Sequence, residues 1–117
     1  QKAVYNEVLK IQREAKKLLV PGTTMDTYHE TIGHTVTESL LSLGLLQKDE
    51  VDKSPLAYKK YFMHGVSHHL GLDVHDVHVR TAPLAPGMVL TCEPGIYIPQ
   101  ENLGVRLENN IQIDQQF

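Results

Sequence analysis

The 117-residue chain is 41% hydrophobic and 21% charged, with a formal net charge of −3. Length and composition are typical of one globular domain with a modest core. A mildly acidic chain without a basic run does not favour nucleic acid or an anionic membrane as a partner. No apolar run reaches the roughly 18 residues of a spanning helix, and nothing resembles a signal peptide. The single Cys92 excludes an internal disulfide and favours a reducing compartment, which we take to be the cytoplasm.

The first segment, KAVYNEVLKIQREAKKLLV, predicts an amphipathic helix that Pro21 and Gly22 end. Charged residues fill one face, while apolar residues recur at steps of three and four. Because this pattern begins directly after Gln1, which is not a Met, we expect the chain to be a fragment, a processed product or one part of a larger polypeptide. The apolar face consists of Val4, Val8, Ile11, Ala15, Leu18 and Leu19.

A second amphipathic helix is predicted to begin after Asp26 or Thr27 as its N-cap and to stop at Gly44. A capping-box spacing at Thr27 supports this start. His29 and His34 lie on this helix, and we predict structural roles for both. The apolar stripe consists of Tyr28, Ile32, Val36, Leu40 and Leu43.

The rest of the chain changes from helix to strand and turn. Residues 47–63 are charged and then aromatic, which predicts a loop with a short helix. GMVLTCEPGIYI alternates and places Val89, Thr91 and Glu93 on one face. GVRLENNIQI alternates more clearly, with a core face of Val105, Leu107, Ile111 and Ile113 and an outer face of Arg106, Glu108, Asn110 and Gln112. Helices followed by strands predict an α+β fold in which two helices cover one face of an antiparallel sheet.

The stretch HGVSHHLGLDVHD, residues 64–76, holds four of the seven histidines. Two interpretations assign the histidines no chemistry: a solvated loop, and a glycine-rich turn whose polar residues cap nearby backbone groups. The third is a set of ligands and proton carriers that await carboxylates from elsewhere. His64 and His68 have the spacing of a helical HExxH zinc motif, but Gly65 stands where its Glu belongs and Gly71 weakens a helix, so that motif is rejected.

Two carboxylates on the strands are the candidate partners. Considered separately, each carboxylate has a structural interpretation. Glu93 would flank the Pro-Gly turn, and Glu108 would form a surface ion pair with Arg106. Together with an imidazole, two such Glu residues on separate strands could supply three ligands to a divalent cation that activates water. This oxygen-rich set without thiolate suits manganese, cobalt or zinc better than copper.

Three blocks, FMHGVSHHLGLDVHDV, PGMVLTCEPGIYI and GVRLENNIQI, closely resemble the catalytic domain of the Xaa-Pro aminopeptidase (aminopeptidase P) family. That family comprises dinuclear metallopeptidases with the pita-bread fold. The similarity covers nearly the whole chain and implies that residues 1–117 are the C-terminal half of the catalytic domain. Prolidase shares these blocks and is the nearest alternative. A non-catalytic pita-bread module that binds peptides is another, although it would have no need of His68, Glu93 and Glu108 together.

The resemblance implies a role for each matching position. His68 resembles the metal-ligating histidine, Glu93 the ligand and candidate proton carrier of the EPG motif, and Glu108 the carboxylate that bridges both metals. The second-shell arginine that orients the site corresponds to Arg106. His69, His78 and Cys92 receive no role in the site.

Two histidines of the motif are expected to face the substrate. His64 resembles the one that steadies developing charge at the scissile carbonyl, and His75 resembles the one that contacts the substrate near its proline. The resemblance thus implies, as the substrate, a peptide with proline in the second position.

The resemblance also implies two further aspartate ligands upstream of the first helix, so that this chain carries three of five. In the complete enzyme we expect two Mn²⁺ ions, with Zn²⁺ or Co²⁺ as alternatives. The isolated chain is expected to bind at most one divalent ion, weakly, and to leave Xaa-Pro peptides uncleaved. An open sheet edge and apolar surface predict a homo-oligomer.

Overall fold

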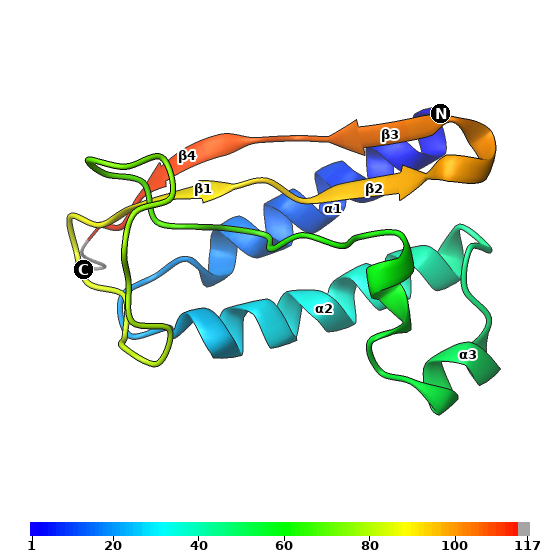
Figure 1. The fold of residues 1–117 in the computed structure, drawn as a ribbon, viewed down its shortest axis with the longest axis horizontal. Coiled ribbons are helices and arrows are strands. Elements are labelled where there is room, and N and C mark those ends of the chain that lie inside the picture. The colour runs from blue at the N-terminus through cyan, green and yellow to red at the C-terminus, as the bar shows by residue number, and fades with distance from the viewer. Residues whose placement is uncertain (115–117) are drawn as a thin grey trace.

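In the computed structural model, which describes residues 1–114, helices and strands form two layers (Figure 1). The helical elements are α1 (Lys2–Leu18), α2 (Met25–Ser42), α3 (Lys48–Lys53), and the short 3-10 turns η1 (Ala57–Lys60) and η2 (Pro99–Glu101). The strands are β1 (Val89–Cys92), β2 (Gly95–Ile98), β3 (Leu103–Arg106) and β4 (Asn109–Gln112). The predicted α+β fold, with helices packed on antiparallel strands, is confirmed.

The strands form two antiparallel pairs, β1 with β4 and β2 with β3, that continue one another in a single register. Cys92 pairs with Asn109 at the end of one ladder, and Gly95 pairs with Arg106 at the start of the other. Pro94 lies between them and has no N–H to donate, which interrupts the ladder without shifting it.

An extended segment, residues 61–70, runs along the other edge of β1 and β2 (Figure 1). Its carbonyl groups accept bonds from the strand amides: Thr91 N–H donates to His68 O at 2.9 Å, and Glu93 N–H to Val66 O at 2.7 Å. The Leu70 amide donates in return to Val89 O. The histidine-rich motif is therefore fixed beside the strands by its backbone.

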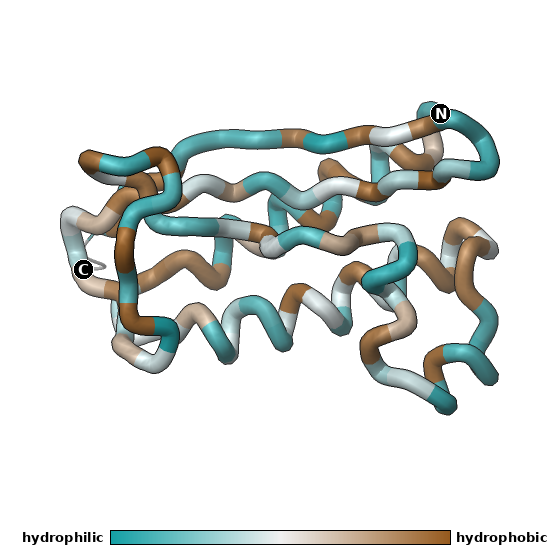
Figure 2. The backbone as a smooth tube through the Cα atoms, viewed as in Figure 1, coloured by the Kyte–Doolittle hydropathy of each residue, from teal (hydrophilic) through white to brown (hydrophobic). Residues whose placement is uncertain are grey.

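The core lies between α1, α2 and the inner faces of the strands. α1 contacts α2 and three of the strands, and the predicted stripe residues Val8, Ile11 and Ile32 are fully buried. Figure 2 shows apolar residues recurring along both helices and along the strands. The strand residues on this face include Leu90, Cys92, Ile96 and Ile113, all fully buried, as the alternation predicts.

The start of α2 differs from the prediction. The N-cap is Thr24, not Asp26 or Thr27, and its hydroxyl accepts a bond from the Thr27 amide. Thr24 satisfies an amide of the first turn from directly before Met25, the first residue of the helix, so the capping box expected at Thr27 does not form. The other end agrees with the prediction, because α2 stops at Ser42 and Gly44 has a φ of +72°. Within the described part of the chain, no helix has the length and apolar character to cross a membrane.

Candidate metal centre

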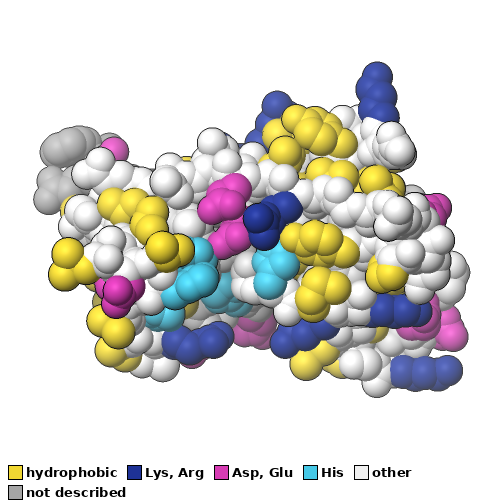
Figure 3. Space-filling model, turned by 45° about the horizontal axis from the view of Figure 1, so that its top comes forward, with side chains coloured by type: hydrophobic (Ala, Val, Ile, Leu, Met, Phe, Trp, Pro, Cys, Tyr) yellow, Lys and Arg dark blue, Asp and Glu magenta, His cyan; other side chains and the backbone are white. Residues whose placement is uncertain are grey.

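The strand face that points away from the core is called the polar strip here. It includes both candidate carboxylates, Glu93 and Glu108. The shared register places Glu93 directly opposite Glu108, between the Cys92–Asn109 and Gly95–Arg106 pairs. Opposed residues of antiparallel strands point to the same face, with Cβ atoms about 4.5–5.5 Å apart. Figure 3 shows acidic and imidazole side chains gathered together on one face of the molecule.

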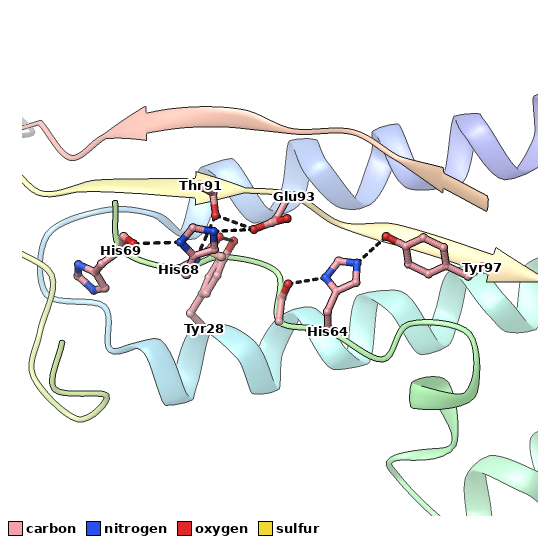
Figure 4. A network of polar contacts seen from close by, with 9 residues as sticks. Tyr28, His64, His68, His69, Thr91, Glu93 and Tyr97 are labelled. Atoms are coloured by element: carbon pink, nitrogen blue, oxygen red, sulfur yellow. Dashed lines mark hydrogen bonds and ion pairs between the residues drawn. The ribbon is translucent and has the colours of Figure 1, made fainter. Parts of the chain in front are cut away.

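His68 reaches this strip from the neighbouring extended segment. Its Nε2 lies 3.0 Å from Glu93 Oε1, and both side chains are largely buried (Figure 4). The two residues are 25 positions apart in sequence, and the backbone bond between Thr91 N–H and His68 O brings them together. The structure therefore joins two of the three residues expected to bind metal.

The hydrogen bonds of His68 indicate which of its two ring nitrogens carries the proton and which one faces Glu93. Nδ1 is 3.0 Å from the carbonyl oxygen of His69. A carbonyl can only accept, so Nδ1 carries the proton, and Nε2 of a neutral ring is a bare lone pair. That lone pair then faces a carboxylate oxygen at 3.0 Å. Such an arrangement is favourable only with a cation between the two atoms, either a proton on Nε2 or a metal ion.

The separation also fits a metal ion. Two ligands bound about 2.1 Å from one ion and at right angles to each other lie about 3.0 Å apart, which is the separation of His68 Nε2 and Glu93 Oε1. Imidazole nitrogen and carboxylate oxygen are donors that manganese, zinc and cobalt accept. The residues present therefore fit a divalent cation.

Glu108 faces the strip but is exposed. Among residues 1–114, no group of three or more His, Cys, Asp or Glu side chains is arranged to hold a metal ion, so convergence of His68, Glu93 and Glu108 stays a prediction. The surface pair considered as its alternative is not formed either: Arg106 is exposed, and no ion pair joins it to Glu108 in the described part of the chain. Register alone links Glu108 to the site.

His64 lies on the same side as the strip, beside Tyr97 of β2 (Figure 4). Its Nδ1 is 2.8 Å from the Gly65 carbonyl oxygen, and its Nε2 is 2.7 Å from the Tyr97 hydroxyl. Nδ1 must donate to the carbonyl, so Nε2 of the neutral ring accepts from Tyr97. Both nitrogens are thus engaged, and a bond from His64 to a substrate would have to replace one of these contacts.

His75 comes from the loop that follows the extended segment 61–70 and is exposed, yet its ring contacts His68 with centroids 4.4 Å apart. It therefore lies beside the candidate ligand. His69 instead stacks on His78, with centroids 4.7 Å apart. Burial, followed by the neighbouring His78, lowers the pKa of His69, while Asp76 opposes the change.

Several residues that support the site were not predicted from sequence. Thr91 bonds to His68 and Glu93, and Tyr97 bonds to His64. Strand parity could have indicated both, because Thr91, Glu93 and Tyr97 are separated by even numbers of residues and therefore share one face. Nothing in the pattern indicated that Tyr28 of α2 would reach Ser67.

The bond between Tyr28 and Ser67 supports the motif from beneath. The two hydroxyl oxygens are 2.8 Å apart, and both residues are buried. Burial raises the pKa of the Tyr28 phenol above its ordinary range, so it stays protonated and can donate. Because Ser67 directly precedes His68, this contact ties the ligand segment to α2.

The chain belongs to metallopeptidase family M24, whose sequence pattern matches residues 1–115. It is 37% identical to Xaa-Pro aminopeptidase 3 of Homo sapiens over 98% of this chain and 25% of that protein. It is 40% identical to Xaa-Pro aminopeptidase of Haemophilus influenzae over 95% of this chain and 29% of that protein. The chain therefore spans about a quarter of the length of the curated relatives it matches.

Solved structures agree with this assignment. The Zn-substituted aminopeptidase P of Escherichia coli, in complex with product, superposes with a TM-score of 0.85 at 38% identity. The match covers 97% of this chain and 29% of that one. The same enzyme with the inhibitor Pro-Leu gives the same TM-score and coverage. The family suggested by the three sequence blocks is confirmed.

Proposed function

We propose that this chain forms part of the metal site of a peptidase that releases the N-terminal residue from peptides with proline in the second position. The observation that carries the proposal is the pairing of His68 Nε2 with Glu93 Oε1 at 3.0 Å, with Nδ1 of the same ring held by a carbonyl. This pair requires a cation, and membership of a metallopeptidase family makes a metal ion the cation to test. The names of the relatives supply the Xaa-Pro specificity that the proposal adopts.

In the proposed site, His68, Glu93 and Glu108 hold divalent metal. The metal supplies Lewis acidity and an activated water for hydrolysis of the amide bond. Glu108, opposite Glu93 in the register, would supply a carboxylate shared between two such ions. We expect Mn²⁺ to be preferred over Zn²⁺ or Co²⁺, since two of these three ligands are carboxylates.

The remaining site residues handle protons and substrate. Glu93 is a candidate proton carrier as well as a ligand, because only one of its oxygens faces His68. His75, exposed beside His68, is free to donate a hydrogen bond toward the substrate. His64 takes the same kind of role once its bond to Tyr97 is exchanged for one to the scissile carbonyl. A prolyl amide has no N–H, so the proline must be recognised by the shape of its ring.

We further propose that residues 1–117 are the C-terminal part of a pita-bread catalytic domain and that two aspartates from the rest of the polypeptide complete the ligand set. Two features support this division: the chain covers 29% of the matching solved structures, and the strip holds two ligands in contact. Strands β3 and β4 each pair on one side only in the described residues. That open edge is expected to make the isolated chain self-associate, which light scattering would reveal.

The full-length protein provides the test. We expect about two Mn²⁺ per polypeptide by elemental analysis and cleavage of Xaa-Pro-Xaa tripeptides that chelation abolishes and Mn²⁺ restores. Tripeptides with alanine in the second position serve as the matched control and should be poor substrates. Turnover of Xaa-Pro dipeptides in preference to tripeptides would instead assign prolidase activity. A protein that neither binds divalent metal nor cleaves either substrate would refute the proposal and favour a peptide-binding module.

A further inference from the structure

Thr91 lies between the two residues that form the candidate metal pair. Its side chain is 3% exposed, and its hydroxyl oxygen is 3.1 Å from the His68 amide nitrogen and 3.0 Å from Glu93 Oε1 (Figure 4). The His68 amide thus bonds to the side chain of Thr91, while the Thr91 amide bonds to the His68 carbonyl. One residue therefore contacts His68 twice and Glu93 once.

The His68 amide and the Thr91 hydroxyl each have one hydrogen to donate, and this determines the direction of both bonds. The His68 amide can only donate, so the Thr91 oxygen accepts there with a lone pair. The hydroxyl has one hydrogen, and that hydrogen is left for Glu93 Oε1. The chain of bonds runs from the His68 amide through the Thr91 hydroxyl to the Glu93 carboxylate, and no other direction satisfies all three groups.

The bond from the Thr91 hydroxyl fixes the orientation of the Glu93 carboxylate, which packing of the Thr91 side chain alone would not do. A glutamate side chain loses rotamer freedom when it is fixed, and a ligand that is already fixed avoids this cost on binding. Thr91 donates to Oε1, the oxygen that also faces His68 Nε2. The same oxygen thus receives the Thr91 hydroxyl and keeps a lone pair for a cation shared with His68 Nε2.

Local structure explains why threonine suits this position. Thr91 and Glu93 are two residues apart on one strand face, so their side chains are neighbours. Branching at Cβ restricts the hydroxyl to few orientations and favours a strand. Valine has the same shape without the hydroxyl, and alanine differs from serine in the same way. The chain therefore offers two pairs of substitutions in which only the hydroxyl changes.

We propose that Thr91 is a positioning residue that couples His68 to Glu93 and orients the carboxylate for a divalent cation. This inference rests on the proposed function, because it assigns a task to the pair only if the pair binds metal. Hydrogen-bonding partners of metal ligands contribute about 10- to 100-fold to metal affinity. We expect a loss of that size when the Thr91 hydroxyl is removed.

The experiment measures Mn²⁺ affinity by calorimetry in the full-length protein and its variants. Thr91→Val should bind Mn²⁺ about 10- to 100-fold more weakly than the parent, and Thr91→Ala should show the same loss relative to Thr91→Ser. Thr37→Val is the control, since in the described part of the chain the Thr37 hydroxyl bonds only to Gly33 O, within α2. Turnover of Thr91→Val should recover toward the parental value at saturating Mn²⁺, which a purely structural defect would not do.

Hydrogen exchange supplies a readout without metal or substrate. In the metal-free protein, Thr91→Val should speed exchange of the His68 amide and leave the Leu70 amide, which bonds to Val89 O, unchanged. If Thr91→Val fails to fold, the serine and alanine variants decide the outcome. Equal Mn²⁺ affinity within both pairs, in a protein that binds metal and cleaves Xaa-Pro-Xaa, would overturn the role of Thr91 alone. A parent protein that binds no metal would overturn the proposed function and this inference together.

Discussion

His68 and His75 lie with their rings in contact, but the backbone holds them in different ways. His68 belongs to the extended segment 61–70, which bonds to the alternate residues Val89, Thr91 and Glu93. His75 belongs to the loop at residues 71–82, whose backbone bonds are isolated contacts, such as Asp76 N–H to His69 O and Asp26 N–H to Arg80 O. Residues 61–70, called the ladder segment below, therefore position His68 by a ladder of backbone hydrogen bonds, whereas His75 is positioned by a loop.

The two regions also differ in packing. The ladder segment includes Val66 and Ser67, both buried, whereas the loop exposes Leu72, Val74, Val77 and Val79. Figure 2 shows brown, apolar stretches along the loop that projects at one end of the molecule. Metal ligands must keep fixed distances. The difference suggests a division of work between the two neighbouring histidines: the ladder segment fixes His68 for metal, and the loop presents His75 to the substrate.

The strongest test of this division is His68→Ala in the full-length protein. Loss of the ring removes a direct ligand, so Mn²⁺ affinity should fall by more than about 100-fold, the upper end of what partners of ligands contribute. Activity should disappear with the metal. Elemental analysis after dialysis is the measurement, and His34→Ala, an exposed histidine of α2, is the control. Metal content equal to that of the parent would remove His68 from the site.

The next effect concerns the histidines that face the substrate. His75→Ala and His64→Ala should each lower kcat by about 100-fold, because a positioned proton carrier or oxyanion donor contributes about that much or more. Metal content should remain that of the parent in both. Steady-state kinetics on Xaa-Pro-Xaa with parallel metal analysis would decide. Loss of metal in His75→Ala would mean that the loop also holds the cation, and the division of work would fail.

How far the sequence predicts this site depends on which force positions each residue. Alternation of Val105, Leu107 and Ile111 predicted the strand faces, because burial on one side of a pleated strand is a local property. The contact between His68 and Glu93 required a register between two distant segments, and only resemblance to the family indicated it. Thr24 as N-cap and the Tyr28–Ser67 bond were missed, because several residues near each could have served equally well.

A smaller effect is expected beneath the ladder segment. Tyr28→Phe leaves the buried Ser67 hydroxyl without its partner, which should lower the free energy of unfolding by about 1–3 kcal/mol. Removing both hydroxyls, with Tyr28→Phe and Ser67→Ala together, should cost less than the sum of the single changes. Urea denaturation of the four proteins measures this. Strict additivity would show that the two hydroxyls do not interact.

The smallest effect is a dependence of stability on pH that originates at His29, on α2 next to Gly65 of the ladder segment. Burial lowers the pKa of His29 below its usual 6.5, despite the bond to the Met25 carbonyl that opposes the change. The unfolded chain therefore binds this proton at a higher pH than the folded one. Stability should be complete above about pH 6.5 and should fall as pH drops toward the folded pKa.

For one proton the slope between those two pKa values is at most about 1.4 kcal/mol per pH unit. His29→Gln cannot take up the proton, so the variant should lose this part of the slope, while exposed His34→Gln should keep it. Urea denaturation of the parent, His29→Gln and His34→Gln at pH 5, 6 and 7 measures how the free energy of unfolding of each protein depends on pH. His69, whose pKa is lowered by burial, contributes with the same sign and should leave a residual slope in His29→Gln. A slope unchanged by His29→Gln would show that His29 does not dominate the response to acid, and would point to His69 of the ladder segment instead.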